Sequence, residues 1–576
     1  MNARALKKED RPIVFESEKD VPPLAISLGT TLFNKTGSWK NIEPFYMDKM
    51  PPCNNSCPAG EDIVLQLWLT KERRFKEAVE ILKSETPFPA TCGRVCPRFC
   101  ERECNRKEFD GSVAIRAEER FLGDYALKIG WRPRRQRRRR ENVAVVGSGP
   151  AGLSCAHFLA VFGYSVTVFE ARPKPGGMMR VGIPSYRLPR DVLDAEIEQI
   201  VSSGLRIECG ARLGESLTWR DLSRFDATCL ATGFHKSRPL GIPGEEMEGV
   251  LSGVDLLRSL AAGRKVRLGK KVGIIGGGNT AVDVARSVLR LGRTPIVIYR
   301  RTREEMPAIA EEVDDAVEEG VTFHFLASPV KVIGRSGKIS QLECIKTRLG
   351  SVDETGRRRP IPVRHSNFRM KVDNLVRAIG EEADTSFMPD DLRRDWRVMI
   401  DKYGMTSMKP VFACGDVATG EGTVAHAIGS GKSAAVAIDR FLRGVRRPNP
   451  HETIRFSSRR YDDYVTRFDD LNLDYFERKE RLAQARLALS RRKKGFKEVN
   501  LGFDAAGAAE ESERCFTCGT CNLCENCLIY CPDLAVRWKR GRKSLSFSYE
   551  FCKGCGICSE ECPRDAIEMR EVLRGV

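Results

Sequence analysis

The distribution of cysteines constrains the fold of this chain more than any other feature. Of 21 cysteines in 576 residues, six lie between Cys53 and Cys104, ten lie between Cys515 and Cys562, and five are scattered between these groups. The first residues are charged and lack the apolar core of an export signal, and no run of about 20 apolar residues occurs. We therefore expect a cytoplasmic protein without a membrane span, whose thiols bind metal rather than form disulfides.

The ten carboxy-terminal cysteines contain one spacing twice. Each run has three cysteines separated by two residues, a fourth after three more residues, and then a proline. In bacterial ferredoxins with this spacing, three cysteines of one run and the fourth of the other bind each 4Fe–4S cluster. The two expected ligand sets are Cys521, Cys524, Cys527 and Cys562, and Cys531, Cys552, Cys555 and Cys558. Cys515 and Cys518 continue the first run upstream; they could shift its register, but we interpret them as spare thiols.

The middle of the chain, residues 141–442, alternates short β-branched runs with Ala-rich stretches, which predicts parallel sheets covered by helices. Its first strand leads into Gly147, Gly149 and Gly152, and the next strand ends at Glu170. Gly147 permits a tight turn, Gly149 lets the backbone approach a pyrophosphate, and Gly152 lets helix and strand pack closely. The Glu170 carboxylate can accept hydrogen bonds from ribose hydroxyls. We therefore expect a dinucleotide site here.

A second copy of this unit begins at Lys271. Its strand leads into a glycine-rich turn and a helix, with Gly276, Gly278, Asn279 and Thr280 as the expected binding residues. The following strand ends not in an acid but in Arg300 and Arg301. Guanidinium groups bind phosphate in a bidentate fashion, so this pair favours NADPH over NADH. Alternatively, the two arginines pair with Glu304 or Glu305 at the surface.

Two such fingerprints in one chain resemble the flavoproteins with two dinucleotide-binding domains, the first domain for FAD and the second for a nicotinamide. Ala231-Thr232-Gly233, Cys414-Gly415-Asp416 and the helix start at Thr423 match further motifs of that superfamily. The residues expected to bind cofactor in the first domain are Gly147, Gly149, Pro150, Ala151, Gly152, Glu170, Ala171, Gly177, Met178, Arg187, Thr232, Gly233, Gly415, Asp416, Thr423 and Val424.

The disulfide reductases of that superfamily need a cysteine pair close to the flavin. Residues 171–208 contain no cysteine, and residues 273–372 contain only Cys344. Electrons must therefore leave the flavin by another route.

The amino-terminal cysteines indicate that route. Cys53 and Cys57 precede a group with the phrase Thr91-Cys92-Gly93-Arg94-Val95-Cys96-Pro97. This set resembles the helical domain of the glutamate synthase small subunit family, shared with dihydropyrimidine dehydrogenase, which holds two 4Fe–4S clusters beside the flavin. Nearly the whole chain takes part in the resemblance.

This chain departs from that family because no cysteine precedes Cys53. One or two amino-terminal clusters are therefore expected. One would use Cys57, Cys96, Cys100 and a non-cysteine ligand such as Glu119. A second, on Cys53, Cys92 and Cys104, would need an outside ligand.

These signals predict a multidomain fold with an α-helical iron–sulfur domain, an α/β two-dinucleotide-binding core and an α+β bacterial ferredoxin-like domain. Asp62–Lys83 is expected to form one amphipathic helix, and 471–492 another. The expected boundaries are 1–130 for the helical 4Fe–4S domain, 131–140 for an Arg-rich linker, 141–240 with 373–445 for the FAD domain, 241–372 for the NAD(P) domain, 446–510 for a linker or arm, and 511–576 for the ferredoxin domain.

The resemblance implies an NAD(P)H:acceptor oxidoreductase that passes electrons through FAD and 4Fe–4S clusters to or from a protein partner. The ferredoxin-like end, without an amidotransferase part, resembles fused members that serve dissimilatory sulfite reductase or 2-oxoacid:ferredoxin oxidoreductases, and ferredoxin itself is a third candidate. The phrase Thr36-Gly37-Ser38-Trp39 is a feature of the sulfite-reductase-associated flavoproteins and favours a partner in sulfur metabolism. No side-chain acid or base is assigned, and the sequence fixes neither the direction of electron flow nor an oligomeric state.

Two other classes of function fit part of the sequence. A subunit that uses FAD only structurally is disfavoured by the intact second fingerprint. The net charge of +18 and the arginine tract at 132–140 suggest nucleic acid, but no interleaved aromatic residues accompany the tract. We therefore expect no nucleic-acid partner and interpret the tract as a solvated linker.

Overall fold

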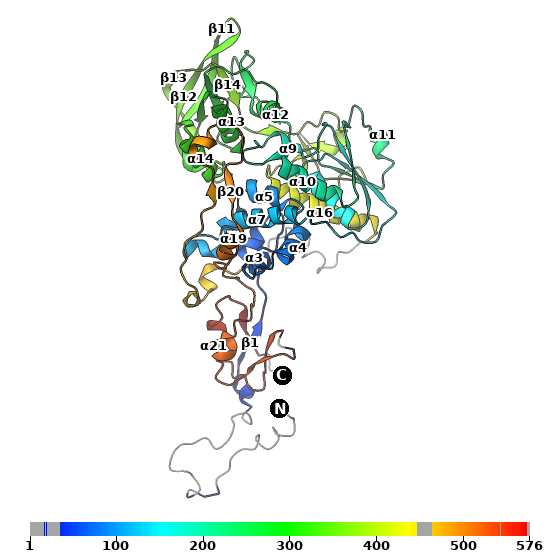
Figure 1. Ribbon diagram of the computed structural model, residues 1–576, viewed down its shortest axis with the longest axis vertical. Helices are drawn as coiled ribbons and strands as arrows, with labels where there is room; N and C mark the ends of the chain where they lie inside the picture. Colours follow the sequence, from blue (N-terminus) through cyan, green and yellow to red (C-terminus); the bar gives the residue numbers. More distant parts are fainter. Residues whose placement is uncertain are drawn as a thin grey trace.

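The computed structural model describes residues 16–17, 19, 35–394, 396–445, 464–541 and 543–572. The molecule is elongated, with two α/β domains at one end, a group of short helices in the middle and a small module at the other end (Figure 1). We call the middle part, residues 52–130, the helical domain. The end module, residues 36–50 and 519–572, is called the ferredoxin-like module.

The first α/β domain is built on a five-stranded parallel sheet in the order β18-β5-β2-β3-β4. Its β-branched strands are almost fully buried, because helices cover them. The strands are β2 (Asn142–Val146), β3 (Ser165–Glu170), β4 (Arg206–Cys209), β5 (Ala227–Leu230) and β18 (Val411–Ala413).

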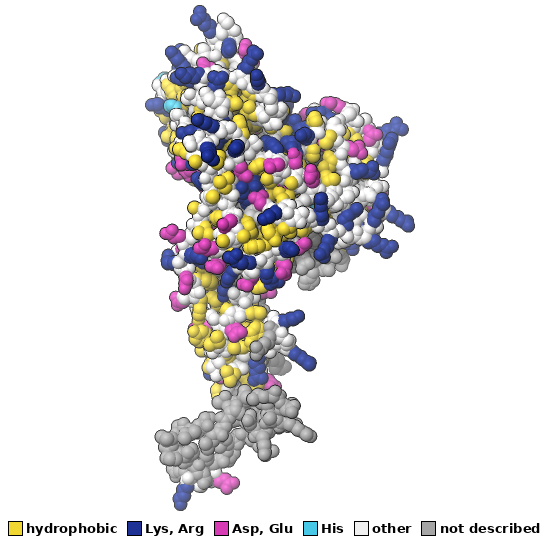
Figure 2. Space-filling model, viewed as in Figure 1, with side chains coloured by type: hydrophobic (Ala, Val, Ile, Leu, Met, Phe, Trp, Pro, Cys, Tyr) yellow, Lys and Arg dark blue, Asp and Glu magenta, His cyan; other side chains and the backbone are white. Residues whose placement is uncertain are grey.

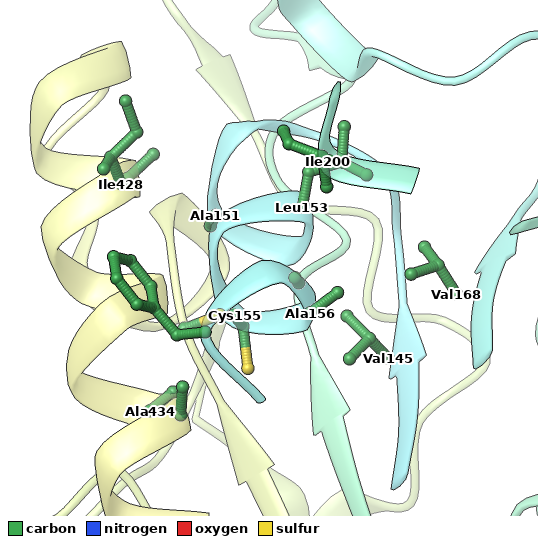
Figure 3. Packing of buried hydrophobic residues seen from close by; sticks show 14 of the residues in the cluster. Val145, Ala151, Leu153, Cys155, Ala156, Val168, Ile200, Ile428 and Ala434 are labelled. Atoms are coloured by element: carbon green, nitrogen blue, oxygen red, sulfur yellow. The ribbon is translucent and has the colours of Figure 1, made fainter. Parts of the chain in front are cut away.

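Helix α8 (Pro150–Val161) lies between this sheet and α16 (Val424–Leu442) and forms the centre of the core (Figure 3). A β-carbon at Gly431 of α16 would come within 2.2 Å of the Ala151 carbonyl oxygen, so the two helices touch through backbone. On another side of α16, a β-carbon at Gly429 would lie 1.9 Å from the carbonyl oxygen of Pro58, which belongs to the helical domain. The helical domain is therefore packed directly on the first α/β domain.

The second α/β domain has another five-stranded parallel sheet, in the order β10-β9-β8-β14-β7. Strand β14 lies between β8 and β7, so the expected return to the first domain at residue 373 was wrong. The chain returns only after Arg377, because residues 374–377 complete this sheet. The elements are β7 (Val250–Ser252), β8 (Lys271–Ile275), β9 (Thr294–Tyr299), β10 (Thr322–Phe325), β14 (Asn374–Arg377), α12 (Gly253–Ala261), α13 (Asn279–Arg290), α14 (Ala310–Glu319) and the antiparallel strands β11 (Ala327–Arg335), β12 (Lys338–Val352) and β13 (Arg358–Lys371).

In the helical domain, the single helix expected over 62–83 was wrong. The structure has two helices that are separated by Arg73, whose φ of 55° is incompatible with a continuous right-handed helix. The reversal lets Leu69 from one helix and Leu82 from the other pack on Leu122. The helices are α2 (Pro52–Ser56), α3 (Ile63–Lys71), α4 (Phe75–Glu85), α5 (Pro89–Val95), α6 (Phe99–Arg102) and α7 (Ile115–Lys128).

The ferredoxin-like module joins segments from both ends of the described chain. β1 (Ile42–Tyr46) pairs antiparallel with β23 (Ile567–Glu571), with Ile42 opposite Glu571. The assignment of residues 1–130 to one helical domain was therefore wrong for β1. The remaining elements are α20 (Asn526–Ile529), β21 (Val536–Trp538), β22 (Leu545–Phe547) and α21 (Ile557–Glu560).

The segment between these parts is an arm rather than a compact domain, and its residues 446–463 lie outside the described residues. The helix expected over 471–492 was wrong, because only its last residues, Leu489–Arg492, are α-helical and residues 476–488, which contact the helical domain, form no helix. Arg478 donates to the Phe109 carbonyl oxygen at 2.6 Å, and Arg481 donates to the Ser112 carbonyl oxygen at 3.1 Å. The elements of the arm are β19 (Ala485–Arg486), α18 (Leu489–Arg492), β20 (Asn500–Gly502) and α19 (Ala505–Ser512).

The arginine tract lies against the first α/β domain. The Gln136 amide donates to the Val161 carbonyl oxygen at 2.8 Å, and the Arg139 amide donates to the Gly163 carbonyl oxygen at 2.9 Å. The Arg139 guanidinium lies 5.0 Å from the centre of the Tyr164 ring. The tract therefore holds the linker against the first α/β domain. Within the described part of the chain, no helix is both long and apolar enough to cross a bilayer.

Candidate functional site

An open cavity lies where the carboxyl ends of the two parallel sheets face each other. Most of the residues expected to bind cofactor line it: Gly147, Gly149, Pro150, Ala151, Glu170, Ala171, Gly177, Met178, Arg187, Thr232, Gly233, Asn279, Thr280, Gly415, Asp416, Thr423 and Val424. Five expected residues do not line it: Gly152, Gly276, Gly278, Arg300 and Arg301. The carboxyl edge of a parallel sheet is where such folds bind nucleotides.

The first glycine-rich turn fits a dinucleotide. A β-carbon at Gly147, where φ is 110°, would come within 2.4 Å of the Ala231 carbonyl oxygen, and one at Gly152 would come within 1.9 Å of the Gly147 carbonyl oxygen. Gly149, by contrast, faces open space, with no atom within 4 Å of its would-be β-carbon. This turn keeps the backbone accessible to a phosphate, as the sequence predicted.

The polar groups of the cavity also fit FAD. Glu170 ends β3, and its carboxylate accepts the Ser148 amide at 3.0 Å and the Arg172 amide at 2.8 Å. These bonds fix the carboxylate at the cavity wall, where ribose hydroxyls can donate to its remaining lone pairs. Thr232 Oγ1 and His235 Nδ1 are buried without a protein hydrogen-bond partner, although both residues line the cavity. Such buried atoms are expected to bond a ligand or water.

The second glycine-rich turn is similarly tight, but its two arginines differ from each other. A β-carbon at Gly276 would come within 2.1 Å of the Ala378 carbonyl oxygen. Arg301 is buried and donates to Asp353 at 2.7 Å and to the Arg358 carbonyl oxygen at 2.7 Å, so it is not free for a phosphate. The Arg300 side chain remains accessible to solvent. The part of it that is shielded from water, and then the positive charges of Arg301 and Arg357, lower the pKa of its guanidinium.

The alternative pairing of these arginines with Glu304 or Glu305 is not what the structure has. The Glu305 carboxylate is bound instead by Arg358, at 2.6 Å. Of the expected pair, only Arg300 therefore stays a candidate for the 2′-phosphate.

The carboxy-terminal cysteines form the two sets that the spacing predicts. One small void is lined by Cys521, Cys524, Cys527 and Cys562. A second small void is lined by Cys531, Cys552, Cys555 and Cys558. All 21 cysteines are free thiols. Among the described residues, no three Cys, His, Asp or Glu side chains converge as they would on a single metal ion.

Glu119 lies among the thiols nearest the flavin cavity. Its Oε1 atom is buried without a hydrogen-bond partner. Burial raises the pKa of the Glu119 carboxyl well above its usual range, and the nearby Glu61 and Cys96 raise it further. Cys57 in turn lies beside Glu61, Cys96 and Glu119. The chain therefore brings Cys57, Cys96 and Glu119 together, which fits the first of the two expected amino-terminal sets. We call Cys57, Cys96, Cys100 and Glu119 the flavin-side ligands.

Comparison with known proteins decides the family. The model of the pyridine nucleotide-disulphide oxidoreductases matches residues 141–431. The model described as dihydropyrimidine dehydrogenase domain II, 4Fe-4S cluster, matches residues 47–131, and a 4Fe-4S binding domain matches residues 545–568. The chain belongs to the pyridine nucleotide-disulphide oxidoreductase family. Its amino-terminal and carboxy-terminal 4Fe–4S domains make it an iron–sulfur flavoprotein oxidoreductase, as the sequence predicted.

Three curated relatives share much of the chain. The beta subunit of NADP(+)-dependent formate dehydrogenase from Moorella thermoacetica is 40% identical over 81% of this chain and 70% of its own length. The beta subunit of NADPH-Fe(3+) oxidoreductase from Geobacter sulfurreducens is 39% identical over 82% and 76%. The small chain of glutamate synthase [NADPH] from Azospirillum brasilense is 32% identical over 68% and 87%. The glutamate synthase small-subunit resemblance is thus confirmed.

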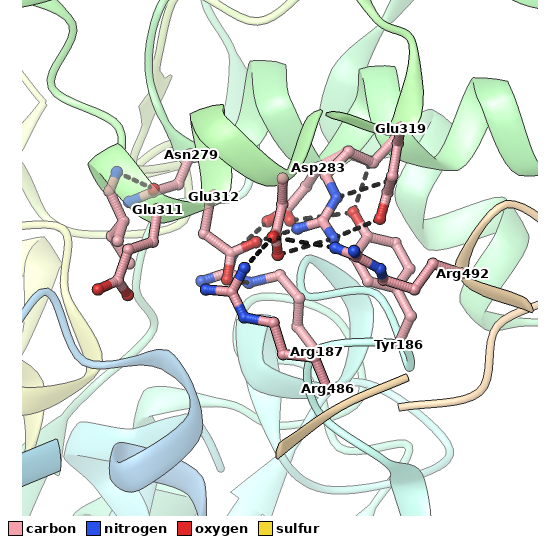
Figure 4. Close-up of polar contacts among 12 residues, drawn as sticks. Tyr186, Arg187, Asn279, Asp283, Glu311, Glu312, Glu319, Arg486 and Arg492 are labelled. Carbon is pink, nitrogen blue, oxygen red and sulfur yellow. Dashed lines mark hydrogen bonds and ion pairs between the residues drawn. The ribbon is translucent and has the colours of Figure 1, made fainter. Parts of the chain in front are cut away.

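Arg187 lines the cavity, but its guanidinium serves the domain interface. It pairs with Asp283 at 2.8 Å and with Glu312 at 3.1 Å, both from the second α/β domain (Figure 4). Arg286 lies within the same group and pairs with Glu319 at 2.7 Å. From the arm, Arg492 reaches Asp315 at 3.3 Å. We call this group the interdomain clamp: Arg187, Asp283, Arg286, Arg290, Glu312, Asp315, Glu319, Arg486 and Arg492.

Several cavity residues escaped sequence reasoning. Glu381 lines the cavity, and burial raises the pKa of its carboxyl although the Thr280 hydroxyl bonds to it. Its signal is Ala378-Ile379-Gly380, which parallels Ala231-Thr232-Gly233 at the end of a central strand. Val95 and Pro97 also line the cavity, although they belong to the helical domain. They flank Cys96, so a predicted cluster ligand lies next to the flavin cavity.

The second expected amino-terminal set was wrong in its membership. Cys92 lies on α5 beside Glu119 and Cys96, and it packs in the core of the first α/β domain. Cys53 and Cys104 lie elsewhere, in one void with Cys515 and Cys518. The interpretation of Cys515 and Cys518 as spare thiols therefore fails to account for their placement.

Proposed function

We propose that this chain is the electron-converting subunit of a redox complex, linking NADPH to a protein partner through FAD and 4Fe–4S clusters. The observation that carries the proposal is the shared position of Cys96, whose neighbours Val95 and Pro97 line the flavin cavity. Electrons leaving that cavity would meet cluster ligands at once, and the ferredoxin-like module, with β1 and α21, lies at the far end of the molecule (Figure 1). The same order serves electron flow in either direction.

Bound FAD would supply the redox chemistry, taking an electron pair from the nicotinamide and passing single electrons to iron–sulfur clusters. The protein binds and orients the two nucleotides. The turn at Gly147–Gly152 would hold the pyrophosphate, and Glu170 would hold a ribose. The second turn, at Gly276–Thr280, would hold the nicotinamide nucleotide. The interdomain clamp keeps both turns facing one cavity, so the reacting rings are oriented without an acid or base from the protein.

NADPH is the proposed nucleotide. Arg300 is exposed just beyond the end of β9, where the 2′-phosphate of a nucleotide held at the second turn would lie. The relatives from Moorella and Geobacter carry NADP(+) and NADPH in their names, which agrees with this choice.

The partner is proposed to dock at the ferredoxin-like module. On the ferredoxin-like module, Ile529, Leu534 and Ile557 are 66%, 59% and 37% exposed, and Cys555 is also exposed. Hydrophobic side chains also show on the face of the narrow module in Figure 2. Apolar side chains in this number on a small module indicate a protein contact. A sulfite reductase, a 2-oxoacid oxidoreductase or a ferredoxin would each suit this surface.

The proposal is tested by anaerobic titration of the purified protein with NADPH and, separately, with NADH. NADPH is expected to bleach both the flavin bands and the iron–sulfur absorbance. A flavin that neither nucleotide bleaches would overturn the enzymatic assignment.

Arg300→Ala sharpens the nucleotide choice. Loss of a charge-assisted contact of about 1.5–3 kcal/mol is expected to weaken NADPH binding by roughly tenfold or more and to leave NADH binding unchanged. Arg293→Ala is the matched control, because Arg293 lies just before the same strand, at its opposite end. Equal weakening of NADPH by both substitutions would remove Arg300 from the phosphate site.

A further inference from the structure

We propose that Cys53, Cys104, Cys515 and Cys518 bind a further 4Fe–4S cluster that joins the helical domain to the ferredoxin-like module. Two ligands come from the amino-terminal part of the chain and two from its carboxy-terminal part. The cluster site itself follows from the thiol geometry; its role as an electron relay rests on the function proposed above.

The four thiols share one void with the dimensions of a cluster site. This void is the same size as the two voids inside the ferredoxin-like module. Each of the three voids is lined by four cysteines. The rest of the wall is mostly apolar and includes Val64, Leu67 and Ile115. A dry pocket with four thiols suits an iron–sulfur cluster, whose potential depends on such shielding.

Hydrogen bonds to sulfur give a second, independent match. The Thr517 amide donates to Cys515 Sγ at 3.4 Å, and Asn105 Nδ2 donates to Cys518 Sγ at 3.5 Å. In the ferredoxin-like module, the Ala535 amide donates to Cys531 Sγ at 3.2 Å in the same manner. N–H donors to ligand sulfur stabilise the thiolates of a bound cluster.

Buried ion pairs hold the two contributing segments together. Arg514, directly before Cys515, is fully buried and donates to Asp110 at 3.0 Å and to the Gly111 carbonyl oxygen at 2.6 Å. Arg106, close to Cys104, pairs with Asp110 at 2.6 Å. The loop after Cys104 and the turn at Cys515 are therefore fixed to each other, which a pair of spare thiols would not require.

The placement also resolves the shortage of ligands in the helical domain. With no cysteine before Cys53 and with Cys92 turned toward the first α/β domain, the helical domain offers only Cys53 and Cys104 at this void. The run of cysteines at every third residue from Cys515 to Cys527 then supplies ligands to two different sites. Its first two members complete this site, and the following ones enter the ferredoxin-like set.

The site occupies the gap in the electron path. Cys53 lies one helical turn from Cys57 of the flavin-side ligands, and Cys518 is three residues from Cys521 of the ferredoxin-like module. Each transfer across it would move one electron, reducing the acceptor cluster by one and oxidising the donor by one, with no bond made or broken. Without it, the flavin-side ligands and the ferredoxin-like module would have no carrier between them.

The experiment compares the full-length wild type with the double variant C515S/C518S, both purified and reconstituted anaerobically. We expect about sixteen iron atoms per FAD in the wild type, for four clusters, and about twelve in the double variant. C209S is the matched control, because Cys209 is exposed and outside every thiol void; it should keep the wild-type count. Equal iron content in the wild type and the double variant would overturn the proposal.

Native mass spectrometry of the wild type covers the case in which the double variant does not fold. Four clusters per chain are expected, and three would overturn the proposal. The relay role is read separately, by electron paramagnetic resonance after addition of NADPH. In the double variant NADPH should still bleach the flavin but no longer reduce the ferredoxin-like clusters. If NADPH fails to bleach the flavin of the wild type, the proposed function fails, while the cluster count still decides the site.

Discussion

The two halves of this molecule are stabilised in different ways. The α/β half has two five-stranded sheets whose strands are buried among helices, and its apolar core runs continuously from β2 through α8 to α16. Among the described residues, the iron–sulfur half has only two-stranded pairs, and its apolar clusters are small, two of them containing cysteines. Burial of apolar area can stabilise the first half alone, whereas the second depends on ion pairs and on ligand bonds to iron.

The two halves also differ in whether the residues that form a site lie close together or far apart in the sequence. In the α/β half, each glycine-rich turn is followed directly by the helix that it starts. In the iron–sulfur half, Cys104 meets Cys515, and β1 meets β23. A fold of the second kind is completed only when segments far apart in the sequence have come together.

Removal of iron should give the largest difference between the halves. After anaerobic chelation, amide exchange in β1 and β23 is expected to rise by about a hundredfold, equivalent to roughly 2.8 kcal/mol of local stability. Amides of β2 and β8 should stay protected, because apolar cores hold them. Hydrogen exchange followed by mass spectrometry measures both, and equal deprotection of all four strands would contradict the distinction.

Arg286→Ala tests the interdomain clamp in the α/β half. The side chain is 1% exposed and pairs with Asp315 at 3.3 Å and Glu319 at 2.7 Å. Its loss leaves Glu319 paired with Arg290 alone, and Asp315 keeps Arg486 and Arg492. The buried acids lose part of their compensating charge, so we expect a cost of about 1–3 kcal/mol in the free energy of unfolding. Denaturant unfolding monitored by release of flavin measures this cost.

The matched control for the clamp is Arg258→Ala, which removes a surface pair with Asp255 at 2.6 Å. That change should cost about 0–1 kcal/mol. Similar costs for the two variants would show that the buried pairs of Arg286 between α13 and α14 do not stabilise the second α/β domain.

At neutral pH the smallest expected effect concerns His157, which is buried in α8. Burial, with a contribution from Lys83, lowers the pKa of its imidazole to about 3, against 6.5 in the unfolded chain. Between these values the unfolded chain binds a proton that the folded one does not. Stability is therefore fully present above pH 6.5 and falls as the pH drops, by at most about 1.4 kcal/mol per pH unit.

His157→Leu should flatten this part of the stability profile, measured by denaturant unfolding between pH 4 and pH 7. His324→Leu, at an exposed position on β10, is the control. An unchanged slope in His157→Leu would mean that the imidazole does not contribute.

The sequence was informative wherever function depends on contiguous residues. Gly147, Gly149 and Glu170 lie where the fingerprint predicts, because one strand, turn and helix position all of them. The ferredoxin-like sets were also predictable, since their spacing specifies crossed ligation.

Prediction failed where distant segments decide. Arg187 and Arg301 have the right chemistry for a phosphate, yet Asp283 and Asp353 reach them from other elements. From the sequence alone, Cys515 and Cys518 are interpreted as spare thiols, because no residue near them in the sequence indicates that they lie beside Cys53. The break at Arg73 likewise depends on packing against α7 rather than on helix propensity.

The pairing of β1 with β23 has a consequence for synthesis of the protein. Residues 42–46 leave the ribosome early, but their partner strand is made more than 500 residues later. Until then β1 lacks its partner strand. Cys53 and Cys104 likewise lack Cys515 and Cys518, the two cysteines proposed to complete their cluster site. Iron delivery to this end of the molecule must therefore follow translation, whereas the first α/β domain can close around FAD while the last segment is still being made.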